Sequence, residues 1–220
     1  MWTRSDLKTR AKAHFKANYW PTVLVTLVFV FFVLATTSGT TAGQDTDGII
    51  EGTSPVVVGA LLVALVICIA LSIFVDNAFA IGCEKFYLEN GKETKPGFGT
   101  IAFLFKDKNY VHACLTIFVK DLFIALWSLL LVIPGIIKAL EYYMVEFIVA
   151  ENPGISYKEA LAESKKMMNG NKWKAFVLDL SFILWDILVG IPVIGTLIAI
   201  FWVRPYKQQT EAELYLELKK

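Results

Sequence analysis

One apolar run constrains this chain more than any other feature of its sequence. It extends from Val56 to Gly82, and Ser54-Pro55 before it is a usual opening of a helix. A transmembrane helix needs about 20 mainly apolar residues, so the run is long enough to cross a bilayer with tilt. We therefore expect a helical membrane protein rather than a soluble domain.

The composition supports the same expectation. Hydrophobic residues make up 56% of the 220 residues and charged residues 19%, against about 45–50% and about 25% in soluble domains. The net charge of +1 offers no basic field to attract a nucleic acid. Three cysteines without a Cys-x-x-Cys pair indicate neither a disulfide framework nor a zinc site. The length suits one domain, and we treat residues 1–220 as a single membrane domain.

Five further segments are predicted to enter the membrane, which gives an all-α polytopic protein with about six transmembrane helices. They are 23–37, 113–133, 136–150, 176–191 and 194–203. The turns that close the last two hairpins fall at Pro134 and Pro192. The segments 136–150 and 194–203 are too short to cross alone, so re-entrant hairpins are the alternative for these two.

Basic residues predict the orientation, because Lys and Arg near the ends of spans stay in the cytoplasm. Five of them lie in each of the segments 1–20, 84–112 and 151–175, and four lie in 204–220. The segment 38–54 and both proline turns carry none. This alternation predicts six spans with both termini in the cytoplasm.

Three cytoplasmic segments also have helical patterns: 4–19, 156–170 and 206–219. The second opens with Ser156 and Glu159, the pattern of a capping box, and ends at Gly170. Within the N-terminal amphipathic helix of 1–20, the residues Leu7, Ala11, His14, Phe15 and Asn18 share one face. We expect this face to lie on anionic headgroups, and a solvated leader is the alternative.

An offset of 58 residues aligns two parts of the chain. Ten of the nineteen positions 118–136 are identical in 176–194. The identities that apolar bias does not readily explain are Asp121 with Asp179, Trp127 with Trp185 and Pro134 with Pro192. Because both copies run outward, we predict a parallel repeat of two helical hairpins, 113–150 and 174–204. The first two spans with a cytoplasmic loop (21–112) precede the repeat, and a cytoplasmic tail (205–220) follows it.

Four motifs carry a resemblance to a known family. They are LKTRAKAHFKANYW (7–20), LVIPGIIKALEYY (131–143), the run ENPGISYKEALAESKKMMNGNKWKAFVLDLSFILWDIL (151–188) and RPYKQQTEAELY (204–215). Through them the chain resembles the bacterial membrane proteins catalogued as domain of unknown function 975, over nearly its whole length. The resemblance implies a multi-pass protein of the bacterial cytoplasmic (inner) membrane. It transfers no catalytic residue, because the family has no established activity.

Eight ionisable residues lie in or near the predicted spans. Seven form the candidate intramembrane polar network, Asp76, Lys120, Asp121, Lys138, Glu141, Asp179 and Asp186, and the eighth is Glu146. A charge at the bilayer centre costs roughly 2.5–3.5 kcal/mol on insertion scales, so we expect these side chains to face inward and find partners. One interpretation is that they form a proton or cation relay, or a polar cavity. The other is that they form buried ion pairs and hydrogen bonds that fix helix register. Their depths predict that Lys138 contacts Asp186, Glu141 or both.

The sequence contains no motif of a serine hydrolase, a zinc protease or a nucleotide-binding loop. We therefore assign no catalytic, cofactor-binding or metal-binding residue and expect no cofactor. The sequence favours a non-enzymatic protein, either a transporter-like bundle or an interaction or protective subunit of the envelope. A membrane-embedded enzyme that acts on a lipid through the intramembrane carboxylates is the alternative. The lipid bilayer is the expected partner, and a membrane-protein partner or a second copy of the chain is left open.

Overall fold

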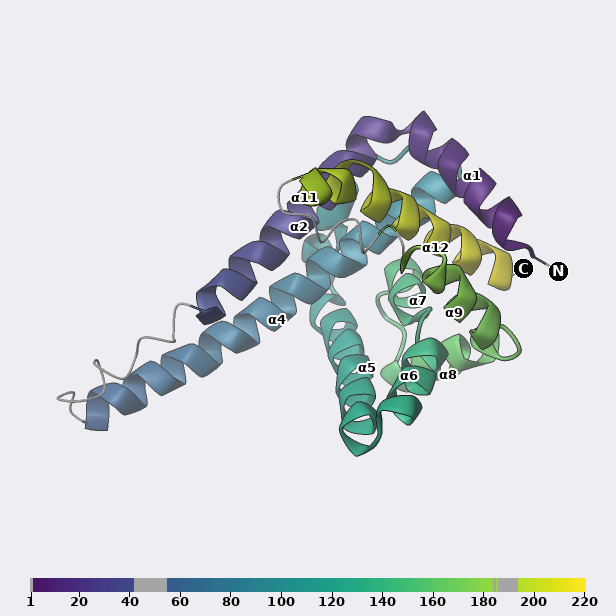
Figure 1. Cartoon of the computed structure of the whole chain (residues 1–220). Helices are drawn as coiled ribbons and strands as arrows, with labels where there is room; N and C mark the ends of the chain where they lie inside the picture. Colours follow the sequence, from purple (N-terminus) through teal and green to yellow (C-terminus); the bar gives the residue numbers. More distant parts are fainter. Residues whose placement is uncertain (1, 42–54, 184, 186–193) are drawn as a thin grey trace.

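The computed structural model describes residues 2–41, 55–183, 185 and 194–220, and the regular structure in this part of the chain is helical (Figure 1). The elements are α1 (Arg4–Ala17), α2 (Tyr19–Thr41), α4 (Pro55–Gly91), the 3₁₀ helix η1 (Phe98–Lys106), α5 (Tyr110–Leu130), α6 (Val132–Glu141), α7 (Val145–Glu151), α8 (Tyr157–Met168), α9 (Lys172–Leu180), α11 (Ile194–Ile198), the π-helix η2 (Ala199–Val203) and α12 (Arg204–Leu218). The prediction of an all-α fold is confirmed over these residues.

The 37-residue helix α4 is the central element of the fold. It begins at Pro55 as predicted, but it continues nine residues past Gly82 to Gly91, where a loop was expected. The reason is burial: Phe86, Tyr87 and Leu88 are fully buried, and the C-terminal part of α4 packs against α1, α7, α12 and η1. The apolar run is therefore only the first part of a longer helix.

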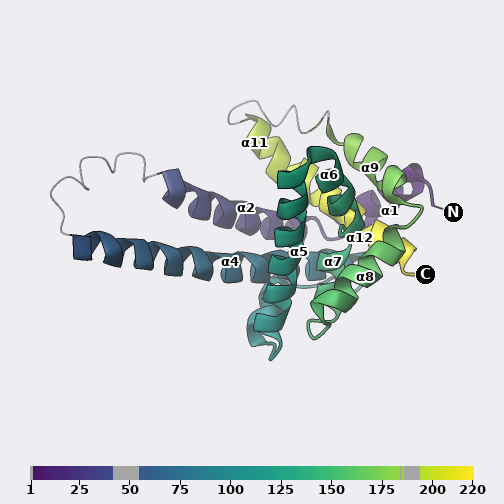
Figure 2. The ribbon, with the colours of Figure 1, turned by 90° about the horizontal axis from the view of Figure 1, so that it is seen from below.

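These packed helices, together with α8 and α9, form a helical body from which two apolar projections extend (Figures 1 and 2). One projection is the antiparallel pair of α2 and the N-terminal part of α4. The other is the hairpin of α5 and α6. Both chain ends lie side by side on the body, because α1 packs on α12. This arrangement places the two termini on the same side of the molecule.

The apolar face of α1 packs inside the protein. Leu7, Ala11 and Phe15 are fully buried, and α1 makes its most extensive contact with α12. Both sequence interpretations of this segment, a helix on lipid headgroups and a solvated leader, were therefore wrong. The apolar spacing showed correctly that one face is covered, but spacing within α1 does not reveal that α12 is what covers it.

The predicted fourth span, 136–150, is not one helix. The structure divides it into α6 and α7, with a turn between them, and the preceding hairpin turn falls at Leu131 rather than at Pro134. Buried Ser164 of α8 holds the turn between the two helices: its hydroxyl donates to the carbonyl of Glu141 at 2.8 Å and accepts from the N–H of Met144 at 3.1 Å. The residues of α7 are then buried in the body instead of facing lipid.

The helix predicted at 156–170 is confirmed as α8, including the reciprocal capping box of Ser156 and Glu159. Gly170 follows the helix with a φ of +75°, a backbone conformation that favours glycine. The helix predicted at 206–219 is confirmed as α12. The predicted hairpin repeat stays a prediction, since Pro192 and Asp186 of its second copy lie outside the described residues, as does most of the loop 38–54.

Candidate functional site

Lys120 is one of the two buried charges among the described members of the predicted network, with 8% of the residue exposed against 7% for Glu141. Its ammonium contacts the carboxylate of Glu146 on α7 and lies 3.1 Å from Oδ1 of Asp121. A buried lysine needs such partners, because an unpaired charge in the protein interior is costly. Lys120 therefore joins α5 to α7 at the base of the α5–α6 hairpin.

A second group of charges surrounds buried Glu141 at the end of α6. Nζ of Lys138 lies 2.7 Å from Oε2 of Glu141, and Nζ of Lys172 lies 2.7 Å from Oε1. The predicted contact between Lys138 and Glu141 is confirmed, whereas Asp186 lies outside the described residues. Lys172 is not in the predicted network, because the sequence places it among the cytoplasmic basic residues. This pairing joins α6 to the start of α9.

Asp179 and Asp76 have different surroundings. The hydroxyl of Tyr143 donates to Oδ1 of Asp179 at 2.9 Å, and Nζ of Lys207 on α12 lies 3.8 Å from the same atom. Asp76 on α4 is partly exposed, and its buried Oδ1 has no hydrogen-bond partner in the part of the chain that the structure describes. Among the described members of the predicted network, the direct contacts are therefore local pairings rather than one connected chain of residues.

The structure adds a carboxyl group that the sequence analysis missed, Glu84. It is 7% exposed, and its buried Oε2 has no hydrogen-bond partner among the described residues. Burial, reinforced by the negative charges of Glu146 and Glu211, raises the pKa of Glu84 well above its usual value, although Lys120 opposes this effect. The continuation of apolar residues past Gly82 was the available signal that this position is buried.

Glu211 on α12 is the second carboxyl group that was missed. Burial, followed by the charge of Asp179, raises its pKa to about 7, while Lys207 and a hydrogen bond with Tyr143 act in the opposite direction. The segment 204–220 was interpreted as a cytoplasmic tail, and a tail would keep this carboxylate in water. Only the packing of α12 against α4 brings it toward Glu84.

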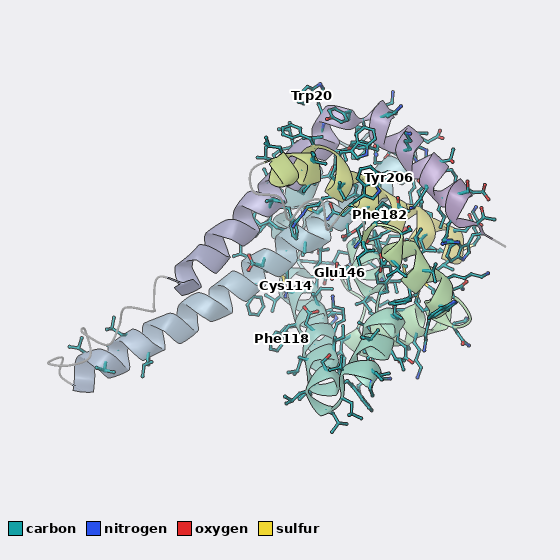
Figure 3. All side chains as sticks on the ribbon, viewed as in Figure 1. Trp20, Cys114, Phe118, Glu146, Phe182 and Tyr206 are labelled. Carbon is teal, nitrogen blue, oxygen red and sulfur yellow. The ribbon has the colours of Figure 1, made fainter. Side chains whose placement is uncertain are left out.

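These groups define what we call the acidic cluster: Glu84, Glu146, Glu211 and Asp179, with Lys120, Lys207 and Tyr143. The members come from α4, α5, α7, α9, α12 and the turn before α7. Figure 3 labels Glu146 within the body, together with Phe182 and Tyr206. The rings of Phe182 and Tyr206 meet edge to face at 5.5 Å between centroids. No group of three or more His, Cys, Asp or Glu side chains in the described ranges could hold a metal ion.

A cavity of about 290 Å³ reaches one edge of the cluster. Its lining residues come from α2 and α12: Thr26, Phe29, Arg204, Lys207, Gln208 and Glu211. Two more cavities, of about 340 and 380 Å³, lie beside Trp2 and Trp173 and beside Glu151 and Tyr215. Asp76 and Glu141 line none of these three cavities.

Residues 129–220 match the model of a family described as protein of unknown function (DUF975). Through this segment the chain is similar to that family. The DUF975 segment starts at the tip of α5 and supplies Glu146, Asp179 and Glu211 to the acidic cluster, whereas Glu84 and Lys120 precede it. No curated protein and no solved structure matches the chain.

Proposed function

We propose that this chain is a non-enzymatic integral membrane protein that holds its helical body at the cytoplasmic face of a bilayer. The α2–α4 pair is its transmembrane anchor, and the α5–α6 hairpin inserts beside it. The observation that carries the proposal is the uncovered apolar surface of α5 and α6. α5 has the length and composition of a membrane span, yet only 28% of its apolar stretch is buried.

The tip of this hairpin consists of large apolar side chains with little protein around them. Leu129, Val132 and Ile133 are 86%, 71% and 72% exposed. Exposed apolar patches of this kind mark membrane or protein interaction sites, and water is an unfavourable environment for them. Lipid acyl chains would cover such a tip without a specific partner.

The charges at the base of the hairpin limit how deeply it inserts. Asp121 and Leu131 are ten positions apart, which corresponds to about 15 Å of helix, and the return helix α6 has only 10 residues before it reaches Glu141. The hydrocarbon core of a bilayer is about 30 Å thick. We therefore favour a re-entrant hairpin that enters from the cytoplasmic side and turns near mid-membrane.

The distribution of basic residues fits this arrangement as well as it fits six spans. A re-entrant hairpin returns to the side from which it came, so the segments 84–112 and 151–175 are cytoplasmic in both arrangements. The termini stay in the cytoplasm, in the bacterial inner membrane that the family resemblance implies.

Aromatic residues at the junction of α1 and α2 support a boundary between water and lipid at that level. Trp20 is 66% exposed and lies at the outer edge of the molecule (Figure 3). The hydroxyl of Tyr19 donates to the carbonyl of Phe201 at 3.3 Å, and Phe15 meets Trp202 edge to face. Trp and Tyr are enriched at such interfaces, because one end of each ring system is apolar and the other is polar.

The pairing of the charges favours an interaction or scaffold role over transport. A transporter needs a water-accessible cavity at its intramembrane charges, whereas Lys120, Lys138 and Glu141 are occupied by one another or by neighbouring groups. Such pairs fix how helices pack.

Nitroxide labels in reconstituted vesicles test membrane insertion. The chain carries a label at Leu131→Cys or at the exposed α8 position Glu163→Cys, with Cys68, Cys83 and Cys114 replaced by alanine. We expect power saturation to show contact of the Leu131 label with oxygen, which partitions into lipid, and of the Glu163 label with an aqueous nickel complex. Equal accessibility of both labels to the nickel complex would overturn the proposal.

A further inference from the structure

The acidic cluster has more carboxyl groups than its lysines can neutralise. The ammonium of Lys120 is occupied by Asp121 and Glu146, and that of Lys207 lies beside Asp179. Glu84 faces this excess of negative charge from α4. Oε2 of Glu84 is buried without a hydrogen-bond donor among the described residues, so it would lose its hydration without compensation, and the neutral acid is the form that burial favours.

The charged groups around Glu84 come from three other helices. Glu146 of α7 and Glu211 of α12 are negative, and Lys120 of α5 is the positive group that faces it. Next to Glu84, Tyr87 directs its hydroxyl to Thr26 of α2 at 2.7 Å. The surroundings of Glu84 therefore contain two competing acids and one lysine that is already bound by other carboxylates.

We propose that Glu84 and Glu211 form a proton-binding site in which Glu84 carries a proton in the folded chain at neutral pH. A proton fits better than a metal ion, because the described His, Cys, Asp and Glu side chains do not converge into a group that could hold one. Glu211 lines the cavity between α2 and α12, so it provides the contact with water through which protons exchange. The site does not depend on membrane insertion.

The proton has a structural consequence for the α5–α6 hairpin. When Glu84 ionises, its carboxylate competes with Glu146 and Asp121 for Lys120, the residue that joins α5 to α7. Deprotonation therefore loosens the base of the hairpin against α4. Protonated Glu84 leaves the pairing of Lys120 intact.

Proton release during unfolding tests the proposal. The full chain and the variant Glu84→Gln, which mimics the neutral acid, are unfolded from detergent at pH 7 in weak buffer with a pH indicator. The wild-type chain is expected to release about one proton more than Glu84→Gln, because the unfolded glutamate ionises at its ordinary pKa. The exposed control Glu163→Gln should match the wild type. Equal release from wild type and Glu84→Gln would overturn the proposal.

A measurement on the wild-type chain avoids any effect of the substitution on folding. With ¹³C-labelled glutamate carboxyl groups, infrared spectra at pH 7 should contain a carbonyl band of a protonated acid, which disappears at higher pH. The absence of this band at pH 7 would overturn the proposal without a variant. In Glu211→Gln the band should disappear at a lower pH, because one negative neighbour is gone. An unchanged midpoint would exclude Glu211 from the site.

Discussion

The side-chain amide of Asn90 donates to Oε1 of Gln209 at 2.7 Å, and both side chains are buried. The same amide of Asn90 also donates to the carbonyl of His14 at 3.3 Å, while Nε2 of Gln209 donates to the carbonyl of Tyr87 at 3.2 Å. Three helices distant in sequence, α1, α4 and α12, are therefore joined by two amide side chains. This junction fixes the C-terminal end of α4 in the body.

Replacing Gln209 with alanine should destabilise the body by about 1–3 kcal/mol, because the buried amide of Asn90 loses its best acceptor. Chemical unfolding of the full chain in detergent measures the change. The neighbouring variant Gln208→Ala is the control, since Gln208 is only partly buried. A loss of equal size in both variants would show that the junction contributes nothing specific.

Gly82 of α4 lies directly against the backbone of η1 at Ile101. A Cβ atom at this position would lie 1.9 Å from the carbonyl oxygen of Ile101, and a backbone group cannot move aside cheaply. Gly82→Ala should therefore lower the free energy of unfolding by at least about 1–3 kcal/mol. Gly59→Ala in the same helix meets nothing within 4 Å and should leave stability unchanged or raise it by up to about 1 kcal/mol. A stable Gly82→Ala chain would contradict this packing.

The Lys120–Glu146 pair should show strong coupling. Glu146→Gln leaves buried Lys120 with Asp121 alone, and Lys120→Met removes the cation that Glu146 and Asp121 share. Each variant should lose about 1.5–3 kcal/mol, whereas the double variant should lose less than the sum of the two. A double-mutant cycle on thermal stability in detergent measures the difference. Additive losses would mean that the two residues do not interact in the folded chain.

Because of Glu151, we expect the folded chain to lose stability in acid. Burial opposes its ionisation, but hydrogen bonds from Lys219, Lys92 and Tyr215 outweigh burial and lower the pKa to about 2. A lowered pKa stabilises the fold above the ordinary value of 4.5, and this contribution disappears as the pH falls from 4.5 toward 2. Unfolding curves at pH 6 and pH 3 should therefore differ more for the wild type than for Glu151→Gln. Equal pH dependence of the wild type and Glu151→Gln would contradict the lowered pKa of Glu151.

The sequence predicted those features that depend on residues close to one another along the chain. The opening of α4 at Pro55 and the capping box of Ser156 and Glu159 are local signals, and both are confirmed. The break after Glu141 could not be predicted, because it is held by Ser164 of another helix. Apolar residues past Gly82 were a signal that Glu84 is buried, but its acidic neighbours come from α7 and α12 and could not be predicted from the residues around it. A count of basic residues predicts the side of the membrane on which a segment lies, but it does not predict whether a helix continues through that segment.

Thiol labelling at the tip of α5–α6 tests most directly whether this hairpin is re-entrant. Intact cells express the chain without its native cysteines and with one new cysteine, at Asp47, Leu131 or Lys165, and are treated with a membrane-impermeant maleimide. The re-entrant arrangement predicts labelling of Asp47→Cys from outside and of Lys165→Cys only after permeabilisation, while Leu131→Cys stays unlabelled in both conditions. Labelling of Leu131→Cys from outside in intact cells would contradict it and show that α5 crosses the membrane completely.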